Sequence, residues 1–576
     1  MLNYRLHHVF VPILGLFTLT VSCSVPAARA PSWSRGPVEA RLEHHLNRLE
    51  QWGFSGGVLV AVGNRILLAD GYGHADVDGL VPVEPGTIFD IGSLTKEFTA
   101  AAILLLQDQG ALSISDSIGK YFDEVPPDKA SITLHHLLTH SAGIAREVGQ
   151  DWEEMSRGTF ESRALAVDLL FEPGQDFSYS NAGYALLASI VERTAGISYH
   201  DFMEREIFRR AGLESTGFIG RSPDPRRTAL AGSGSLAGQN PSDWQHTWNH
   251  RGSGGILSTI GDFLRWRRAL ASGQVVSAEA LALMRTPHVN GYGYGSQIED
   301  RPYGTAYHGT GLWYSFTSSY LEVPGDSLLI LAVSNRRIGP YQPASVVVRD
   351  LTQEYFEGPA TSPPALADRH ISQAGLAGTY RTDSGESVFV AVEDDHLRLD
   401  GVGQRVFDVL FSDASPSPGL LAMLRSRTIA ILEGVGHDDF DTLRVAAPKA
   451  RYERYRRLLP PIWAQRTDSL GALQRVDLLG VVDRGTALDA FASLQFEEGR
   501  EGVRLTWSRE GVLWGLANED PRMDDGLMTF RETEDGTYAA YHFETRVVMR
   551  IRFKHDRLAV LAEDGSVALE ATRTTP

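Results

Sequence analysis

The stretch that decides the fold is Ile91-Gly-Ser-Leu-Thr-Lys-Glu-Phe-Thr-Ala100. It places Ser93 and Lys96 three residues apart at the start of an apolar, helix-forming run. On a helix this spacing puts both side chains on one face. The apolar residues that continue to Leu106 predict that the helix is buried in a core.

Ser93 and Lys96 at this spacing also predict a catalytic site. Ser93 would lie at the N-terminus of the helix, where its own backbone N–H has no helical partner and can face a developing oxyanion. Lys96 could act as the base for Ser93 if its surroundings remove its proton at neutral pH. Lowering a lysine pKa from about 10.4 to about 7 takes on the order of 4 to 5 kcal/mol, which only a built site supplies. We therefore predict Ser93 as the nucleophile and Lys96 as its base.

A second Ser-x-x-Lys match serves as a control. Lysine occurs only five times in the chain, so a chance match to this spacing is uncommon. Ser117-Ile-Gly-Lys120 has the same spacing, but it contains a glycine and is followed by Tyr-Phe-Asp-Glu-Val-Pro-Pro. This composition predicts a short surface turn rather than a site.

Length and charge narrow the class of protein. The 576 residues are too many for one ordinary core, and 43% hydrophobic with 22% charged residues is typical of a globular protein. The formal net charge of −18, with no basic runs, excludes nucleic acid as an expected partner. His136 and His140 stand at i and i+4, but without a third ligand nearby they indicate packing and capping, so we expect no metal and no cofactor.

The N-terminus predicts export. Residues 1–23 carry Arg5 and then an apolar stretch, Val9 to Val21, which has the length of a signal peptide and is too short to span a membrane. The single cysteine, Cys23, follows at once and resembles a bacterial lipoprotein processing site. Lipidation there would attach the protein to a membrane, as a periplasmic or outer-membrane lipoprotein. The alternative is ordinary cleavage a few residues later, which gives a secreted protein.

Strand and helix patterns predict an α+β fold. A helix from Val38 to Trp52 leads into a hairpin, Gly56 to Ala69, and helical patterns dominate from Asp116 to Met284. Strands return from Tyr314 to Val333, followed by a helix from Pro343 to Tyr355. We expect one antiparallel sheet built from the N- and C-terminal pieces, a helical insertion on one side, and the site in the cleft between them.

The rest of the chain reads as a linker and two small antiparallel β units. Residues 358–370 begin with Gly358-Pro-Ala-Thr-Ser-Pro-Pro364, a linker composition. Short strands are expected beyond it, including Phe407–Leu410 and Thr428–Leu432. The predicted domains are 1–23 (signal or lipoprotein segment), 37–357 (catalytic domain), 358–370 (linker), 371–450 (β-rich unit) and 467–576 (β-rich, barrel-like unit). A fragment that ends near Glu357 is expected to fold.

Two further motifs supply candidate site residues. Tyr179-Ser-Asn181 precedes an apolar helix, so Tyr179 could pass a proton to the leaving group and Asn181 could hold Lys96 and the substrate carbonyl. His308-Gly-Thr-Gly311 comes just before the first predicted C-terminal strand and forms a glycine-rich strand entry. Its glycines, Gly309 and Gly311, would let backbone approach the substrate and donate to the oxyanion.

Together these motifs resemble the serine β-lactamase and penicillin-binding-protein superfamily, in the branch of class C enzymes, D-alanyl-D-alanine carboxypeptidases and esterases. The resemblance covers about residues 38–355. It rests on the segments Phe89–Lys96, Ile132–Gly143, Tyr179–Asn181, Gly254–Thr259 and Tyr292–Gly295. It implies that Ser93 is acylated, that Lys96 and Tyr179 move protons, and that Asn181 orients lysine and substrate. The family's third motif, Lys-Thr-Gly or His-x-Gly, is altered here, because Thr310 stands as though inserted after His308 and Gly309.

The resemblance implies an exported serine hydrolase that acts on esters or on peptides and amides of D-amino acids. The alternatives are a β-lactamase or D-Ala-D-Ala carboxypeptidase and, in another class, a non-catalytic envelope protein that binds wall peptides. The partner would be a small molecule or a peptide. His308 is mostly neutral above pH 7, so substrates without a carboxylate are expected to react fastest, unless an arginine replaces the missing lysine. The two β units resemble in layout the appended barrels of D-stereospecific aminopeptidases, which restrict the cleft.

Overall fold

The computed structural model describes residues 37–337, 342–367, 375–393, 396–411, 416–437, 439–483, 487–517, 529–541, 548–562 and 564–574. The predicted signal segment, residues 1–23 with Cys23, lies outside this part. Within the described residues, none of the helices combines the length and the apolar character that a bilayer crossing needs.

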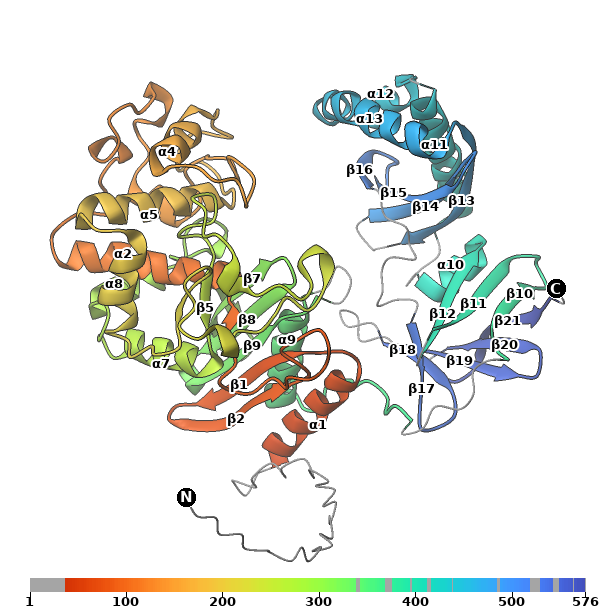
Figure 1. Ribbon diagram of the computed structural model, residues 1–576, viewed down its shortest axis with the longest axis horizontal. Coiled ribbons are helices and arrows are strands. Elements are labelled where there is room, and N and C mark those ends of the chain that lie inside the picture. Colours follow the sequence, from red (N-terminus) through yellow and green to blue (C-terminus); the bar gives the residue numbers. More distant parts are fainter. Residues whose placement is uncertain are drawn as a thin grey trace, which may run out of the picture.

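The predicted catalytic domain is built on a six-stranded antiparallel sheet that joins both ends of the domain, which confirms the predicted fold (Figure 1). The strand order is β2-β1-β9-β8-β7-β6. The strands are β1 (Gly56–Val62), β2 (Arg65–Tyr72), β6 (Gln297–Arg301), β7 (Gly304–Trp313), β8 (Phe316–Val323) and β9 (Leu328–Ser334). The N-terminal hairpin pairs with the C-terminal strands through β1 and β9, from Gly56 opposite Ser334 to Val62 opposite Leu328.

Alternating residues of the sheet bury two different layers. On β1, Val58 and Val60 pack in one core with α1 (Pro37–Gln51) and α9 (Pro343–Phe356). Leu59 and Ala61 point to the opposite face and pack in the core of the helical region. Both faces are therefore covered, which explains why β1 is apolar throughout instead of alternating with polar residues.

The helical region covers the face of the sheet opposite α1 and α9. Its helices are α2 (Thr95–Asp108), α3 (Leu134–Leu138), α4 (Arg157–Ala166), α5 (Asn181–Ala195), α6 (Tyr199–Phe202), α7 (Ile260–Ala271) and α8 (Ala278–Met284). A small sheet, β3 (Phe89–Asp90), β5 (Ile256–Ser258) and β4 (Gly217–Phe218), lies at its base. Every residue of α2 from Thr95 to Leu106 is buried, as its apolar sequence predicts. This helix therefore fixes its side chains, Lys96 among them, inside the protein.

The C-terminal region is rich in strands, as predicted, but its parts are arranged differently. One closed barrel joins β10 (Gly378–Thr382), β11 (Ser387–Glu393), β12 (His396–Val402), β17 (Thr529–Glu532), β18 (Tyr538–Tyr541), β19 (Val548–Lys554), β20 (Arg557–Leu561) and β21 (Val567–Arg573). The barrel draws strands from both predicted β units, because β12 pairs with β17 across more than a hundred residues, with Leu397 opposite Phe530.

A separate unit is inserted into the barrel sequence between β12 and β17. It contains α11 (Pro418–Gly436), α12 (Asp441–Ala446), α13 (Lys449–Leu470) and a sheet of β13 (Leu473–Asp483), β14 (Ala487–Phe496), β15 (Arg500–Ser508) and β16 (Leu513–Ala517). The preceding helix, α10 (Gln404–Phe411), packs in the barrel core through Val406 and Leu410. The strands expected at Phe407–Leu410 and Thr428–Leu432 are parts of helices α10 and α11. Figure 1 shows α11, α12, α13 and the sheet of this unit above the barrel, with the helices on the outer face of the sheet.

The segment after α9 packs against the catalytic domain. Ser362 Oγ lies 2.8 Å from Nδ1 of the buried His45, and the indole N–H of Trp52 donates to the Pro364 carbonyl at 3.0 Å. Trp52 also contacts Tyr541 of the barrel, with 6.1 Å between ring centroids. The first half of the predicted linker is therefore part of the surface of the catalytic domain.

These contacts predict where the chain can be cut. A protein that ends after Ala367 should fold, whereas one that ends after Glu357 should be less stable by about 2 kcal/mol, because it loses the hydrogen bonds of Ser362 and Pro364 at about 1 kcal/mol each. Urea unfolding of the two proteins measures this difference. Insolubility of the longer protein would show instead that the barrel belongs to the catalytic core.

Candidate active site

Ser93 lies on a tight turn that abuts strand β7. It belongs to a short 3-10 helix, η1 (Gly92–Leu94), that leads directly into α2, and its side chain is partly exposed. Gly92 has φ of +51°, and a Cβ at this position would lie 2.8 Å from the backbone nitrogen of Leu312. The glycine therefore provides both the backbone conformation and the room that bring the serine against β7.

Buried polar groups hold this turn. Asp90 accepts a hydrogen bond from the Gly92 N–H at 2.6 Å, and the Ser318 hydroxyl donates to the Ile91 carbonyl at 2.7 Å. Burial raises the pKa of Asp90 to about 7, and the bond from Gly92 opposes that rise. One hydrogen bond within the turn and one from strand β8 therefore fix the turn that carries Ser93.

Lys96 is fully buried and is surrounded by three oxygen atoms. Its Nζ lies 3.1 Å from Ser93 Oγ, and it donates to Asn181 Oδ1 at 2.7 Å and to the Ser253 carbonyl at 2.8 Å. Burial lowers the pKa of Lys96 well below its usual value; the charge of Glu147 opposes this and that of Arg146 adds to it. The site therefore favours the neutral amine.

Asn181 is held by a carboxylate that the sequence motifs did not indicate. Asn181 begins α5, where the Ser180 hydroxyl caps the helix by accepting from the Gly183 N–H at 2.9 Å. Its amide nitrogen donates to Glu147 Oε1 at 2.6 Å. Burial raises the pKa of Glu147. Because Glu147 accepts from the amide nitrogen, the amide oxygen is turned toward Lys96.

Tyr179 lies over Lys96 and rests on a buried histidine. Lys96 Nζ is 4.7 Å from the centroid of the Tyr179 ring. The centroid of the His140 ring lies 4.3 Å from the centroid of the Tyr179 ring, and the planes of the two rings are tilted relative to each other. Burial raises the pKa of Tyr179 to about 12, and a hydrogen bond to Ser93 opposes the rise. The phenol is therefore protonated at neutral pH and lies within reach of the nucleophile.

His140 supports this arrangement from an unusual backbone conformation. Its φ is +59°, which non-glycine residues seldom adopt, and its Nδ1 accepts from the Ser180 N–H at 3.1 Å. His136, in contrast, closes the N-terminal cap of α3 with Thr133. Both histidines thus pack and cap, as the sequence predicted. Among the described residues, no group of three or more His, Cys, Asp and Glu side chains could hold a metal ion.

The third motif contributes backbone at the site but places its histidine elsewhere. Strand β6 pairs with β7 only as far as His308. From Gly309 to Trp313, the edge of β7 on the side of β6 is therefore an open strand edge. A Cβ on Gly311 would lie 2.2 Å from the Ile91 carbonyl and 3.0 Å from Ser93 N, so the glycine permits this close approach.

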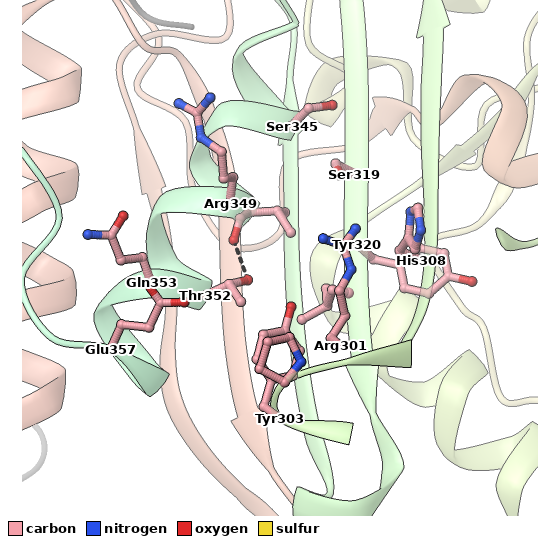
Figure 2. A pocket seen from close by; sticks show the side chains of 13 residues that line it. Arg301, Tyr303, His308, Ser319, Tyr320, Ser345, Arg349, Thr352, Gln353 and Glu357 are labelled. Carbon is pink, nitrogen blue, oxygen red and sulfur yellow. Dashed lines mark hydrogen bonds between the residues drawn. The ribbon is translucent and has the colours of Figure 1, made fainter. Parts of the chain in front are cut away.

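The His308 side chain lines a pocket on the α9 side of the sheet, together with Arg349 and Thr352 (Figure 2). Its Nε2 lies 3.4 Å from Glu299, and burial lowers its pKa. The structure therefore brings Ser93, Lys96, Tyr179, Asn181 and the backbone of Gly311 together. It does not bring the His308 imidazole to them.

The control motif behaves as a surface turn, which confirms that part of the prediction. Ser117 is the N-cap of a short 3-10 helix, Ile118–Lys120, and its hydroxyl donates to the Ala130 carbonyl at 2.7 Å. Lys120 is exposed and pairs with Asp116 at 2.8 Å. The same spacing thus produces a cap and a surface ion pair in one place and a buried lysine beside a serine in the other.

The fold and this site define a hydrolase of the serine β-lactamase and penicillin-binding-protein type. Residues 40–351 match the family model described as Beta-lactamase, which is more than half of the chain, so the chain belongs to this family. Penicillin-binding protein 4* of Bacillus subtilis (strain 168) is 26% identical over 424 residues, which are 68% of this chain and 92% of that protein.

Two solved structures show the same fold. The octameric penicillin-binding protein homologue from Pyrococcus abyssi has a TM-score of 0.50 at 17% identity and covers 93% of this chain and 100% of its own. The beta-lactamase/D-alanine carboxypeptidase from Pseudomonas syringae has a TM-score of 0.50 at 19% identity, over 56% of this chain and 100% of its own.

Proposed function

We propose that this protein is an exported serine hydrolase that forms an acyl-enzyme on Ser93, with Lys96 as the base. Its substrates would be esters or peptides and amides that contain D-amino acids. The observation that carries the proposal is the set of oxygen atoms around Lys96 Nζ. A neutral amine has two N–H donors and one lone pair. Asn181 Oδ1 and the Ser253 carbonyl take the two donors, so the lone pair is left for the Ser93 hydroxyl proton.

In the proposed acylation, Ser93 Oγ attacks the substrate carbonyl carbon while its proton passes to Lys96 Nζ. The negative oxygen that forms would be stabilised by the Ser93 N–H and by an N–H from the open edge of β7 near Gly311. The leaving group departs with a proton from the Tyr179 hydroxyl, and the Lys96 ammonium returns a proton to Tyr179. A water molecule then attacks the acyl-enzyme by the same route and releases the acid.

Export is part of the proposal, with lipidation of Cys23 and membrane attachment as one form and cleavage to a secreted protein as the other. It is supported by the composition of residues 1–23.

The alternatives within the family are a β-lactamase and a D-Ala-D-Ala carboxypeptidase, whose substrates carry a carboxylate. The alternative outside catalysis is an envelope protein that binds wall peptides. The lone-pair geometry at Lys96 favours a catalyst, because a binding protein has no use for a deprotonated lysine beside a serine.

One substrate panel tests the proposal. An activated short-chain ester, a D-alanyl amide and a chromogenic cephalosporin are compared by kcat/KM with the purified protein. We expect the ester to react fastest and the amide next. A cephalosporin hydrolysed as fast as the ester would favour the β-lactamase alternative. Absence of turnover with all three would contradict the proposed function.

A further inference from the structure

Arg146 is a cation at the mouth of the site. Its side chain is 68% exposed, and its guanidinium carbon lies 5.3 Å from the centroid of the Tyr179 ring. Its carbonyl accepts from the N–H groups of Asn181 at 3.0 Å and Ala182 at 3.1 Å. The backbone of Arg146 is therefore fixed to the first turn of α5, the helix that positions Asn181.

The guanidinium retains donors for a ligand. Its nearest carboxylate is Glu147, at 3.6 Å from Nε, and that same oxygen accepts from the Asn181 amide at 2.6 Å. Within the described part of the chain the guanidinium donates no hydrogen bond. A planar group with five N–H donors, stacked beside a tyrosine and open to solvent, matches the two oxygens of a carboxylate.

The position of Arg146 also indicates which part of a substrate it would meet. The Tyr179 ring is close to both basic side chains, with its centroid 4.7 Å from Lys96 Nζ and 5.3 Å from the Arg146 guanidinium carbon. In the proposed reaction the Tyr179 hydroxyl protonates the group that leaves. A group that leaves past Tyr179 therefore meets Arg146.

The third motif does not supply this charge. The His308 side chain faces α9, pairs with Glu299, and has a pKa lowered by burial, so it is neutral at pH 7. A cation for an anionic substrate has to come from another element of the fold.

We propose that Arg146 is the specificity residue that recognises a carboxylate on the leaving-group side of the scissile bond. The favoured substrates would then be peptides or esters whose leaving group ends in a free carboxylate, such as a C-terminal amino acid. This inference rests on the proposed function and deepens it. Among substrates of equal intrinsic reactivity, it replaces the sequence-based expectation that those without a carboxylate react fastest; the activated ester of the substrate panel still reacts fastest because its leaving group is more reactive.

A role of Arg146 in lowering the pKa of Tyr179 predicts a different result from a role in recognising a carboxylate. Its charge also lowers the pKa of Tyr179, an effect that acts on every substrate alike. Recognition of a carboxylate acts only on substrates that carry one. The ratio of kcat/KM between matched substrates separates the two roles.

The experiment uses three aryl esters of N-acetylglycine that differ only at the meta position of the phenol: carboxylate, carboxamide or trimethylammonium. Each rate is divided by the rate of hydroxide-catalysed hydrolysis of the same ester. The full-length protein is compared with Arg146→Gln, Arg146→Glu and the control Arg163→Gln. Arg163 is a 44%-exposed arginine of α4 that binds Glu153.

We expect the unmodified protein and Arg163→Gln to prefer the carboxylate ester over the carboxamide. Arg146→Gln should reduce this preference roughly 10- to 100-fold, the worth of a charge-assisted hydrogen bond. Arg146→Glu should reverse the order so that the trimethylammonium ester reacts faster than the carboxylate ester. A purely structural or Tyr179-directed role cannot produce that reversal.

An unchanged ratio in Arg146→Gln, or equal losses on all three esters, would overturn the inference while leaving the proposed function in place. Absence of Ser93-dependent turnover of all three esters by the unmodified protein would overturn the proposed function, and the inference with it.

Discussion

Replacement of Ser93 by alanine is expected to abolish turnover and covalent labelling together. If Ser93 is the nucleophile, a fluorophosphonate or penicillin probe adds its mass to the single peptide that contains Ser93. Loss of a catalytic serine in an acyl-enzyme mechanism costs on the order of 10⁶-fold in kcat. Because Ser93 is partly exposed at the end of α2, the alanine protein should fold with little change in thermal stability. Mass spectrometry of the labelled protein and steady-state kinetics measure the two effects.

The chain contains a matched control for this prediction. Ser117 and Lys120 repeat the Ser-x-x-Lys spacing on an exposed 3-10 turn, where Lys120 pairs with Asp116. Ser117→Ala should therefore leave labelling and turnover unchanged. Labelling that persists in Ser93→Ala, or that maps to Ser117, would contradict the assignment of the nucleophile.

The catalytic domain was predictable from sequence because its signals are local and strong. The Gly56–Ala69 hairpin, the apolar run after Lys96 and the helix after Pro343 each have a clear period and a turn or breaker at the end. Their assembly into one sheet followed from strands at both ends of a helical middle. The structure confirms this arrangement, with β1 beside β9.

The C-terminal region was less predictable for a physical reason. Phe407–Leu410 and Thr428–Leu432 are short apolar runs, which a buried helix and a buried strand share. Tertiary packing decides between them: Leu432 is buried in a helix, α11, whose core includes Trp507 of β15. The barrel closes through pairs such as Leu397 with Phe530, and no pattern within either segment specifies a partner so distant in sequence.

The candidate site shows the same division between local and distant signals. Ser93 with Lys96, and Tyr179 with Asn181, are short spacings that sequence reasoning can find. Glu147 and the Ser253 carbonyl come from loops without a recognisable spacing, although both determine how Asn181 and Lys96 are held.

His308 shows the limit of a motif without a structure. The sequence placed the motif just before the strands that begin at Tyr314, whereas His308 lies within β7. The sequence also did not indicate on which face of that strand the side chain lies, because a shift of one residue reverses the two faces of a strand.

Replacement of Lys96 by methionine is expected to lower kcat by roughly 10²- to 10⁴-fold, the usual contribution of a positioned general base. Methionine keeps the length and apolar stem of the buried side chain but cannot accept the Ser93 proton. Lys120→Met, at a 55%-exposed lysine, is the control and should retain full activity. Kinetics with the activated ester measure both. Full activity in Lys96→Met would show that another group deprotonates Ser93.

The pH profile tests whether Lys96 works as the neutral amine. Only the deprotonated lysine accepts the Ser93 proton, so kcat/KM should rise as pH increases through the Lys96 pKa and then level off. Because burial lowers this pKa well below its usual value, the plateau should begin well below pH 10. A rate that still rises tenfold per pH unit near pH 10 would indicate an ordinary lysine instead.

Replacement of Glu147 by glutamine tests the direction in which the charge of Glu147 shifts the pKa of Lys96. The negative charge of Glu147 raises the pKa of Lys96, so its removal should lower that pKa further and move the rise in kcat/KM to lower pH. Glutamine keeps an oxygen that can accept from the Asn181 amide, so the geometry around Lys96 is retained while the charge is lost. A shift of the profile to higher pH, or a uniform loss of rate without any shift, would show that Glu147 acts on Asn181 alone and not on the proton of Lys96.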